Sequence, residues 1–209
     1  MTAAEQRESA MTSRPEAPAK PDEAASLPWL TPRQMVVILL FVSMSVLFTA
    51  TIVGFWWTRV YAPHFRAEGL PDLPRGLLLS TALIALISAG IWQAQRAIKR
   101  NQLEAVRRWL LVAGALAVLF LLTQSANWFA MRPPSDAPSL YLATFYILTG
   151  VHALHVIGGF IPLGIVVRHA SRRQYSSSSH EGLSLCAQYW HYLGAVWVVL
   201  VTMLYVGNA

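Results

Sequence analysis

The amino-acid sequence predicts an all-α membrane protein, a polytopic bundle of five transmembrane helices whose N-terminus lies inside and whose C-terminus lies outside. Of its 209 residues, 55% are hydrophobic and 12% are charged, whereas a soluble domain carries about twice that charged share. The apolar residues also gather in five blocks without Asp, Glu, Lys or Arg. Each block reaches or nearly reaches the roughly 20 residues that a helix needs to cross the hydrocarbon core, and β-barrel strands would be shorter and would alternate. The predicted spans cover about residues 35–58, 76–94, 109–128, 140–167 and 183–206.

The orientation follows from the basic residues. The sixteen Lys and Arg residues divide as 4, 3, 5, 1 and 3 over the N-terminal segment and the four loops. With the N-terminus inside, twelve of the sixteen lie on the inside and four on the outside, as the positive-inside rule requires. The net charge of +6 therefore reflects membrane topology and does not indicate a nucleic-acid partner. The densest basic block, which should face anionic headgroups, consists of Arg96, Lys99, Arg100, Arg107 and Arg108.

Residues 1–32 are rich in Ala, Pro and charged side chains and lack the apolar core of a signal peptide. We expect them to form a disordered cytoplasmic tail, and residues 33–209 to form the five-helix transmembrane domain, which begins near Thr31 and Pro32. The single cysteine, Cys186, excludes an internal disulfide and a metal cluster of several cysteines.

Aromatic side chains mark the ends of the spans, as is typical of rings at the membrane interface. They lie at both ends of the first span, around the basic loop between the second and third, and around the short loop between the third and fourth. These aromatic residues are Trp29, Trp56, Trp57, Trp92, Trp109, Trp128 and Tyr141. The prolines of that short loop prevent either flanking helix from extending through it; they are Pro133, Pro134 and Pro138.

The fourth span carries most of the information. Gly150, Gly158 and Gly159 should let a neighbouring helix approach closely, since packing in lipid depends on small residues. Pro162 removes the amide that would bond the Gly158 carbonyl, so a kink is expected there. His152 and His155 are three residues apart and therefore share one face of the helix.

The fifth span adds a third intramembrane histidine, His191, at a depth similar to that of His155. Ionisable groups at such depth usually face the interior of a bundle. Three interpretations remain open. Neutral histidines hydrogen-bonded between helices are favoured, haem or metal ligation by His155 with His191 is the second, and a role in proton relay is the third.

Two segments resemble a known family. The run Phe145-Tyr-Ile-Leu-Thr-Gly-Val-His-Ala-Leu-His155-Val resembles the Phe-Tyr-x-Leu-Thr-Gly-x-His-x-x-His-Val motif of cytochrome c oxidase subunit III. The run Tyr189-Trp-His-Tyr-Leu-Gly-Ala-Val-Trp197 resembles its Tyr-Trp-His-Phe-x-Asp-x-x-Trp motif. Weaker similarity extends over roughly residues 35–206, and five helices would match the short bacterial form. The family-motif and helix-packing residues are Tyr146, Thr149, Gly150, His152, His155, Gly158, Gly159, Gln124, Asn127, Tyr189, Trp190, His191 and Trp197.

The resemblance implies an accessory, non-catalytic subunit of a haem-copper terminal oxidase in the aerobic respiratory chain of a bacterial inner membrane. Such a subunit has no redox centre, stabilises subunit I and binds lipid. Haem and copper, cytochrome c oxidation, oxygen reduction and proton pumping belong to the partner subunits I and II. We therefore expect no catalytic, cofactor-binding or metal-binding residue in this chain.

The sequence departs from the family pattern at its intramembrane carboxylates. These align near Met44 or Ser45, with Asn127, and with Gly194. All ten Asp and Glu residues lie outside the predicted spans. A proton antenna built on buried carboxylates is therefore not expected here, although Asn127 can still form hydrogen bonds.

Two alternative functions remain. One is the related subunit associated with nitric oxide reductases, which sequence separates poorly from the oxidase subunit. The other is an independent membrane cytochrome that binds haem b through His155 and His191. A transporter is disfavoured, because the chain has no internal repeat and no charged substrate site within its spans.

Overall fold

The computed structural model describes residues 32–62, 65, 72–132, 139–175 and 180–208. The predicted N-terminal tail, apart from Pro32, lies outside these residues. The chain divides into two units, residues 1–39 and 40–209. Of the first unit the structure describes the opening turns of one helix, and the second unit contains the rest of that helix and the four helices that follow.

Five long α-helices make up the described chain, and no strand occurs among its described residues, so the predicted all-α class is confirmed. All five are long and apolar enough to cross a membrane. The helices are α2 (Pro32–Tyr61), α3 (Gly76–Lys99), α4 (Leu103–Ala130), α5 (Leu140–Ser171) and α6 (Glu181–Asn208).

The helices extend beyond the predicted spans because a charged residue ends an apolar block without ending a helix. Helix α3 continues through Arg96 to Lys99, and α4 begins six residues before Trp109, with Glu104 in its first turn. Lys, Arg and Glu are good helix formers. At 1.5 Å per residue, helices of 24 to 32 residues are about 36 to 48 Å long. Their ends therefore reach beyond roughly 30 Å of hydrocarbon.

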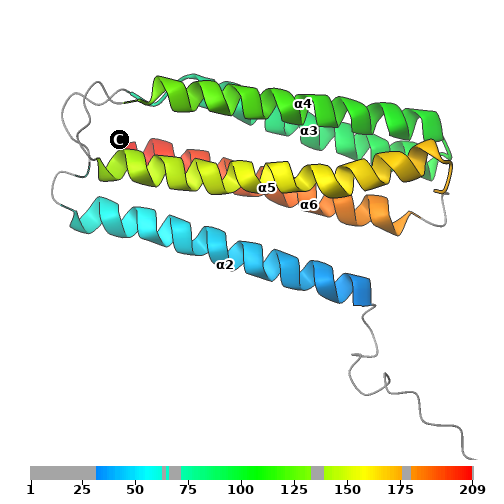
Figure 1. The fold of residues 1–209 in the computed structure, drawn as a ribbon, viewed down its shortest axis with the longest axis horizontal. Coiled ribbons are helices and arrows are strands. Elements are labelled where there is room, and N and C mark those ends of the chain that lie inside the picture. The colour runs from blue at the N-terminus through cyan, green and yellow to red at the C-terminus, as the bar shows by residue number, and fades with distance from the viewer. Residues whose placement is uncertain (1–31, 63–64, 66–71, 133–138, 176–179, 209) are drawn as a thin grey trace, which may run out of the picture. The chain divides into compact units, whose positions relative to one another are not determined.

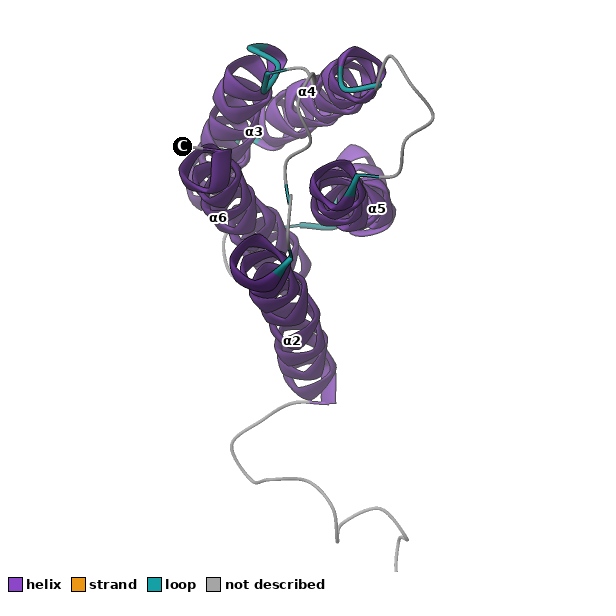
Figure 2. Cartoon of the chain, turned by 90° about the vertical axis from the view of Figure 1, so that its left-hand side faces the viewer, coloured by secondary structure: helices purple, strands orange, loops and turns teal. Residues whose placement is uncertain are grey.

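Helices α3 to α6 form an up-down-up-down four-helix arrangement. Each contacts its two neighbours in the ring α3–α4–α5–α6, and α6 closes the ring against α3. Figure 1 shows the four helices running alongside one another, and Figure 2 shows the ring from its end. The α3–α4 contact is tight, because a Cβ added at Gly90 would lie 3.6 Å from the Ala113 Cβ. Small residues bring the two backbones together, as is usual in lipid.

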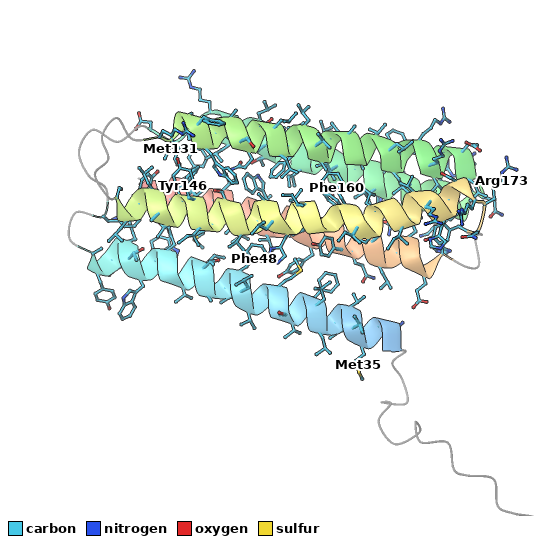
Figure 3. The ribbon with its side chains drawn as sticks, viewed as in Figure 1. Met35, Phe48, Met131, Tyr146, Phe160 and Arg173 are labelled. Carbon is cyan, nitrogen blue, oxygen red and sulfur yellow. The ribbon has the colours of Figure 1, made fainter. Side chains whose placement is uncertain are left out.

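Residues 40–61 of α2 reach α5 and α6 through long side chains. Phe48 packs against the rings of His152 and His155 on α5, at centroid distances of 6.1 and 5.1 Å (Figure 3). The indole of Trp56 donates to the Met203 sulfur of α6 at 2.8 Å. Most of the outward surface of α2 is exposed and apolar, so this helix depends on few anchoring contacts.

Candidate functional site

Among the residues that the structure describes, five polar side chains are buried inside the bundle, and they come from three helices. They lie among apolar residues, and the bonds that each one forms decide what this interior can do. The five are Ser80, Gln124, Asn127, Thr149 and His152.

Asn127 joins α4 to α3. Its side-chain Nδ2 donates to the Ser80 hydroxyl of α3 at 3.3 Å and to the side-chain Oε1 of Gln124 at 3.4 Å. Its side-chain oxygen occupies the space where a Cβ at Gly76 would lie. Gly76 therefore lets the start of α3 approach the carboxamide, and the two helices meet around a neutral amide.

Thr149 and Tyr146 join α5 to α4. The Trp128 indole donates to the Thr149 hydroxyl at 2.9 Å, and that hydroxyl donates to the Phe145 carbonyl at 2.7 Å. The Tyr146 hydroxyl donates to the Trp128 carbonyl at 2.9 Å (Figure 3). Thr149 and Tyr146, both from the first motif, thus bond to the same tryptophan. Thr149 accepts from its indole, and Tyr146 donates to its backbone carbonyl.

His152 lies at the centre of an aromatic enclosure and is fully buried. Its ring lies 4.8 Å from the Trp197 ring, 5.8 Å from Phe120 and 6.1 Å from Phe48, measured between centroids. Neither ring nitrogen has a hydrogen-bond partner in the part of the chain that the structure describes. The favoured interpretation, a histidine hydrogen-bonded between helices, is therefore wrong for His152, because apolar rings surround the imidazole.

His155 bonds within its own helix, since its Nδ1 lies 2.8 Å from the Val151 carbonyl oxygen. The inter-helix bond at this position comes from its backbone. The Tyr189 hydroxyl of α6 donates to the His155 carbonyl at 2.7 Å. The side chain packs on Phe48 of α2.

His191 is the one of these three histidines that bonds to another helix, through its Nδ1 and the Ser88 hydroxyl of α3. It follows Tyr189 by two residues, which is about 200° around α6. Because Tyr189 faces α5, His191 faces away from it. The geometry therefore separates His155 from His191 and argues against a haem held between them. Across the described residues there is no group of three or more His, Cys, Asp or Glu that could hold a metal ion.

The glycines of α5 differ in the space around them. A Cβ at Gly159 would lie 2.9 Å from Tyr189 Cε1 and 3.0 Å from Trp190 Cζ2, so a larger residue here would force one of these rings to move. A Cβ at Gly158 would lie 3.8 Å from the Tyr189 hydroxyl, which is ordinary contact, and one at Gly150 would meet no described atom within 4 Å. The close approach at Gly159 is made by two aromatic side chains of α6.

Trp197 closes the ring of helices. Its indole donates to the Thr81 hydroxyl of α3 at 3.2 Å, and its ring packs edge-on against Phe120 of α4 at 5.0 Å. Trp190, which packs edge-on against Phe160 of α5, is also buried. The motif residues of α5 and α6 therefore act mainly as contacts between helices.

Comparison with known proteins identifies the family of this chain. Residues 33–208 match the family model described as cytochrome c oxidase subunit III. The chain belongs to the cytochrome c oxidase subunit III family. The cytochrome c oxidase subunit 3 of Synechocystis sp. is 31% identical over 176 residues, which are 83% of this chain and 75% of that protein.

Two further relatives show the breadth of the family. The subunit 3 of Thermostichus vulcanus is 24% identical over 181 residues, 83% of this chain and 87% of that protein. The subunit 3 of Homo sapiens is 29% identical over 179 residues, 80% of this chain and 67% of that protein. The predicted family membership is therefore confirmed.

Neutral residues occupy the positions that the motif resemblance aligns with the family's carboxylates, which are Met44 or Ser45, Asn127 and Gly194. The Ser45 hydroxyl lies 2.8 Å from the Tyr192 hydroxyl of α6 and also donates to the Phe41 carbonyl. A Cβ at Gly194 would lie 3.3 Å from Ile84 Cγ2 of α3, which leaves little room for a larger residue. At the third position, the Asn127 carboxamide forms hydrogen bonds with Ser80 and Gln124.

Sequence reasoning missed several residues that anchor this subunit III fold. Arg59 donates through Nε to the Gly207 carbonyl at 2.8 Å, which ties the C-terminal end of α2 to the C-terminal end of α6. Gly207 also accommodates the Phe55 ring, which would collide with a Cβ there. Arg59 and Gly207 both lie near the C-terminal ends of their helices, and no motif covers them.

Proposed function

We propose that this chain is the accessory subunit III of a haem-copper terminal oxidase in a bacterial inner membrane. In this role it stabilises subunit I and binds lipid, while the partner subunits I and II hold the haem and copper and carry out the redox chemistry. Membership of the family supports the general role as an oxidase subunit. The finer assignment rests on what the motif residues do in this chain.

The observation that carries the proposal is that the two family motifs hold helices together. Thr149 receives the Trp128 indole, Tyr189 donates to the His155 carbonyl, and Trp197 donates to Thr81. Residues engaged in this way fix the shape of the subunit, as a supporting role requires. They do not present a set of groups to a substrate or a redox cofactor.

The outer surface supports association with lipid and with other membrane subunits. Exposed large apolar side chains cover the outward faces of α2, α4 and α5, with Leu122 62%, Leu154 67% and Ile161 70% exposed. A surface of this kind is unsuited to water. The distribution of basic residues places the α3–α4 and α5–α6 connections on the inside of the membrane.

The test is a visible spectrum of the chain in two states, within its complex and after separation in detergent. The complex should show haem absorption and the separated chain none, because the histidines do not converge on a haem. A Soret band that stays with the separated chain at one haem per chain would overturn the accessory role. It would favour the haem-b cytochrome.

A further inference from the structure

One face of the bundle combines polar side chains with exposure at membrane depth. We call it the α3/α6 outer face, and it extends along α3 and α6 from the contact between Ser88 and His191. Its residues are Ser88 and Trp92 of α3, with Ser184, Gln188, His191 and Ala195 of α6. Ser184, Gln188 and His191 follow the i, i+4, i+7 spacing that places residues on one side of a helix.

The polar groups of this face are incompletely bonded. Gln188 is exposed, and its carboxamide has no hydrogen-bond partner among the described residues. His191 is partly exposed. Its Nδ1 pairs with the Ser88 hydroxyl, while no described residue bonds its Nε2. One amide and one imidazole nitrogen therefore remain available on the outside of the bundle.

These groups lie at hydrocarbon depth. Gln188 is seven residues and His191 ten residues from the start of α6 at Glu181, which is about 10 and 15 Å along the helix. Helix α6 has 28 residues and spans about 42 Å, so its first turn lies outside a hydrocarbon core of roughly 30 Å. Lipid chains at the depth of Gln188 and His191 offer no hydrogen bonds.

Three threonines in the spans bond to the backbone of their own helix. The hydroxyls of Thr123, Thr144 and Thr202 each donate to the carbonyl four residues earlier on the same helix. Such threonines can face lipid at little cost, because no polar group is left over. Gln188 forms no such bond, so its carboxamide requires a neighbour that can form hydrogen bonds, which lipid chains cannot.

We propose that the α3/α6 outer face binds a transmembrane helix of a partner oxidase subunit that presents a hydrogen-bonding side chain to Gln188 and His191. Ionisable side chains such as His191 almost always face protein or water rather than lipid when they lie within a membrane. Inter-helix hydrogen bonds between such groups stabilise helix association, and the small Ala195 beside them lets a helix come close. This inference rests on the proposed function, because it names the surface through which the subunit joins its complex.

The test compares Gln188→Leu with the matched control Thr202→Val on the same helix. Both variants remove an exposed polar group from α6, but Thr202 is bonded to its own backbone. The measurement is the fraction of the chain that stays with a tagged partner subunit through washes of increasing detergent concentration. Gln188→Leu should reduce retention about threefold to tenfold, the scale of one inter-helix hydrogen bond, and Thr202→Val should leave it unchanged. Gln188→Asn should restore part of the loss.

Two further measurements keep the result decisive. The melting temperature of each separated variant reports folding, and Gln188→Leu should match the wild type because Gln188 bonds to no described residue. His191→Phe tests the second group, with Ser88→Ala as the control for the bond that it also breaks. Retention equal to wild type in both Gln188→Leu and His191→Phe would overturn the inference and leave the face to lipid. If these variants abolish a dimer of this chain but leave its retention by the partner subunit unchanged, the inference is overturned, because the face then binds a second copy of the chain.

The two proposals fail in different ways. If the wild-type chain co-purifies with oxidase subunits and the variants do so equally well, the proposed function stands and the α3/α6 outer face is not the interface. If the wild-type chain retains no oxidase subunit, the proposed function fails and this inference fails with it.

Discussion

The Trp128 indole of α4 donates a 2.9 Å hydrogen bond to the Thr149 hydroxyl of α5, in the interior of the bundle. In lipid the apolar surfaces of two helices gain little by leaving the solvent, so packing and inter-helix hydrogen bonds hold them together. This pair is one of several that join neighbouring helices around the ring.

Removing this bond should destabilise the α4–α5 pair. Thr149→Val keeps the shape of the side chain and should lower the free energy of unfolding by about 1 kcal/mol, since inter-helix bonds in membranes average about 0.6 and reach about 1.7 kcal/mol. Thr144→Val on the same helix is the control, because Thr144 bonds only to backbone carbonyls of α5. The measurement is a double-mutant cycle with Trp128→Phe, and a coupling energy near zero would contradict the assignment.

Gly159 should be the one of two adjacent glycines whose replacement by alanine lowers stability. Gly159→Ala would press a methyl group against Tyr189 and Trp190 and should lower stability by about 1 to 3 kcal/mol, the usual range for overpacking. Gly158→Ala has ordinary contact distances and should be neutral or slightly stabilising, because alanine is the better helix former. Thermal unfolding in detergent measures both. Equal melting temperatures for the two variants would contradict the tight α5–α6 contact.

His152 should be replaceable by an apolar ring. His152→Phe loses no hydrogen bond to a described residue and keeps the ring contacts with Phe120 and Trp197, so stability should stay within about 1.5 kcal/mol of the wild type. His152→Ala leaves a cavity and should cost about 2 to 5 kcal/mol. Chemical denaturation of both variants gives the comparison. A phenylalanine variant as unstable as the alanine variant would show that the imidazole nitrogens form a bond that stabilises the fold.

The histidine variants also test the absence of redox chemistry. His152→Ala and His155→Ala should weaken the fold or its association with partner subunits, while the haem content per subunit I in the remaining complex stays constant. Haem quantified by its visible spectrum against subunit I by mass spectrometry gives this ratio. Haem lost in proportion to the replaced histidine would count against the accessory role.

A hydrophobic carbodiimide, which modifies carboxylates in hydrocarbon, should leave α2 and residues 109–128 of α4 unlabelled. Ser45 and Asn127 are neutral, the acidic residues of the described helices, Glu104 and Glu181, lie in first turns at helix ends, and Asp72 precedes α3. Peptide mass spectrometry after labelling gives the readout, with Ser45→Glu as the positive control. Label on Glu104 or Glu181 would place these helix ends within the hydrocarbon and contradict the assigned spans.

Sequence alone predicted the five helices because uncharged apolar blocks of this length have few other uses. It placed their ends less well, since Arg96 and Glu104 interrupt a hydrophobic block but continue a helix. The motif positions on α5 and α6 were also predictable as packing residues. Their partners were not, because helical periodicity gives the face of a residue and not the helix that the face meets.

His152 and Gln188 each show that the sequence alone does not give the surroundings of a side chain. His152 was expected to form a hydrogen bond, but three aromatic rings from other helices surround it, and nothing in its own helix indicates them. Gln188 belongs to a spacing with Ser184 and His191 that is visible in the sequence. It becomes informative only once the structure shows that this side of α6 is exposed.

Purification through a tag on this chain tests whether it is an accessory subunit of a haem-copper oxidase. Membranes are extracted in mild detergent, and the retained proteins are identified and counted by native mass spectrometry. The account predicts one assembly that contains this chain together with the haem-copper subunits I and II. Recovery of the chain alone, or with partners that carry neither haem nor copper, would contradict it.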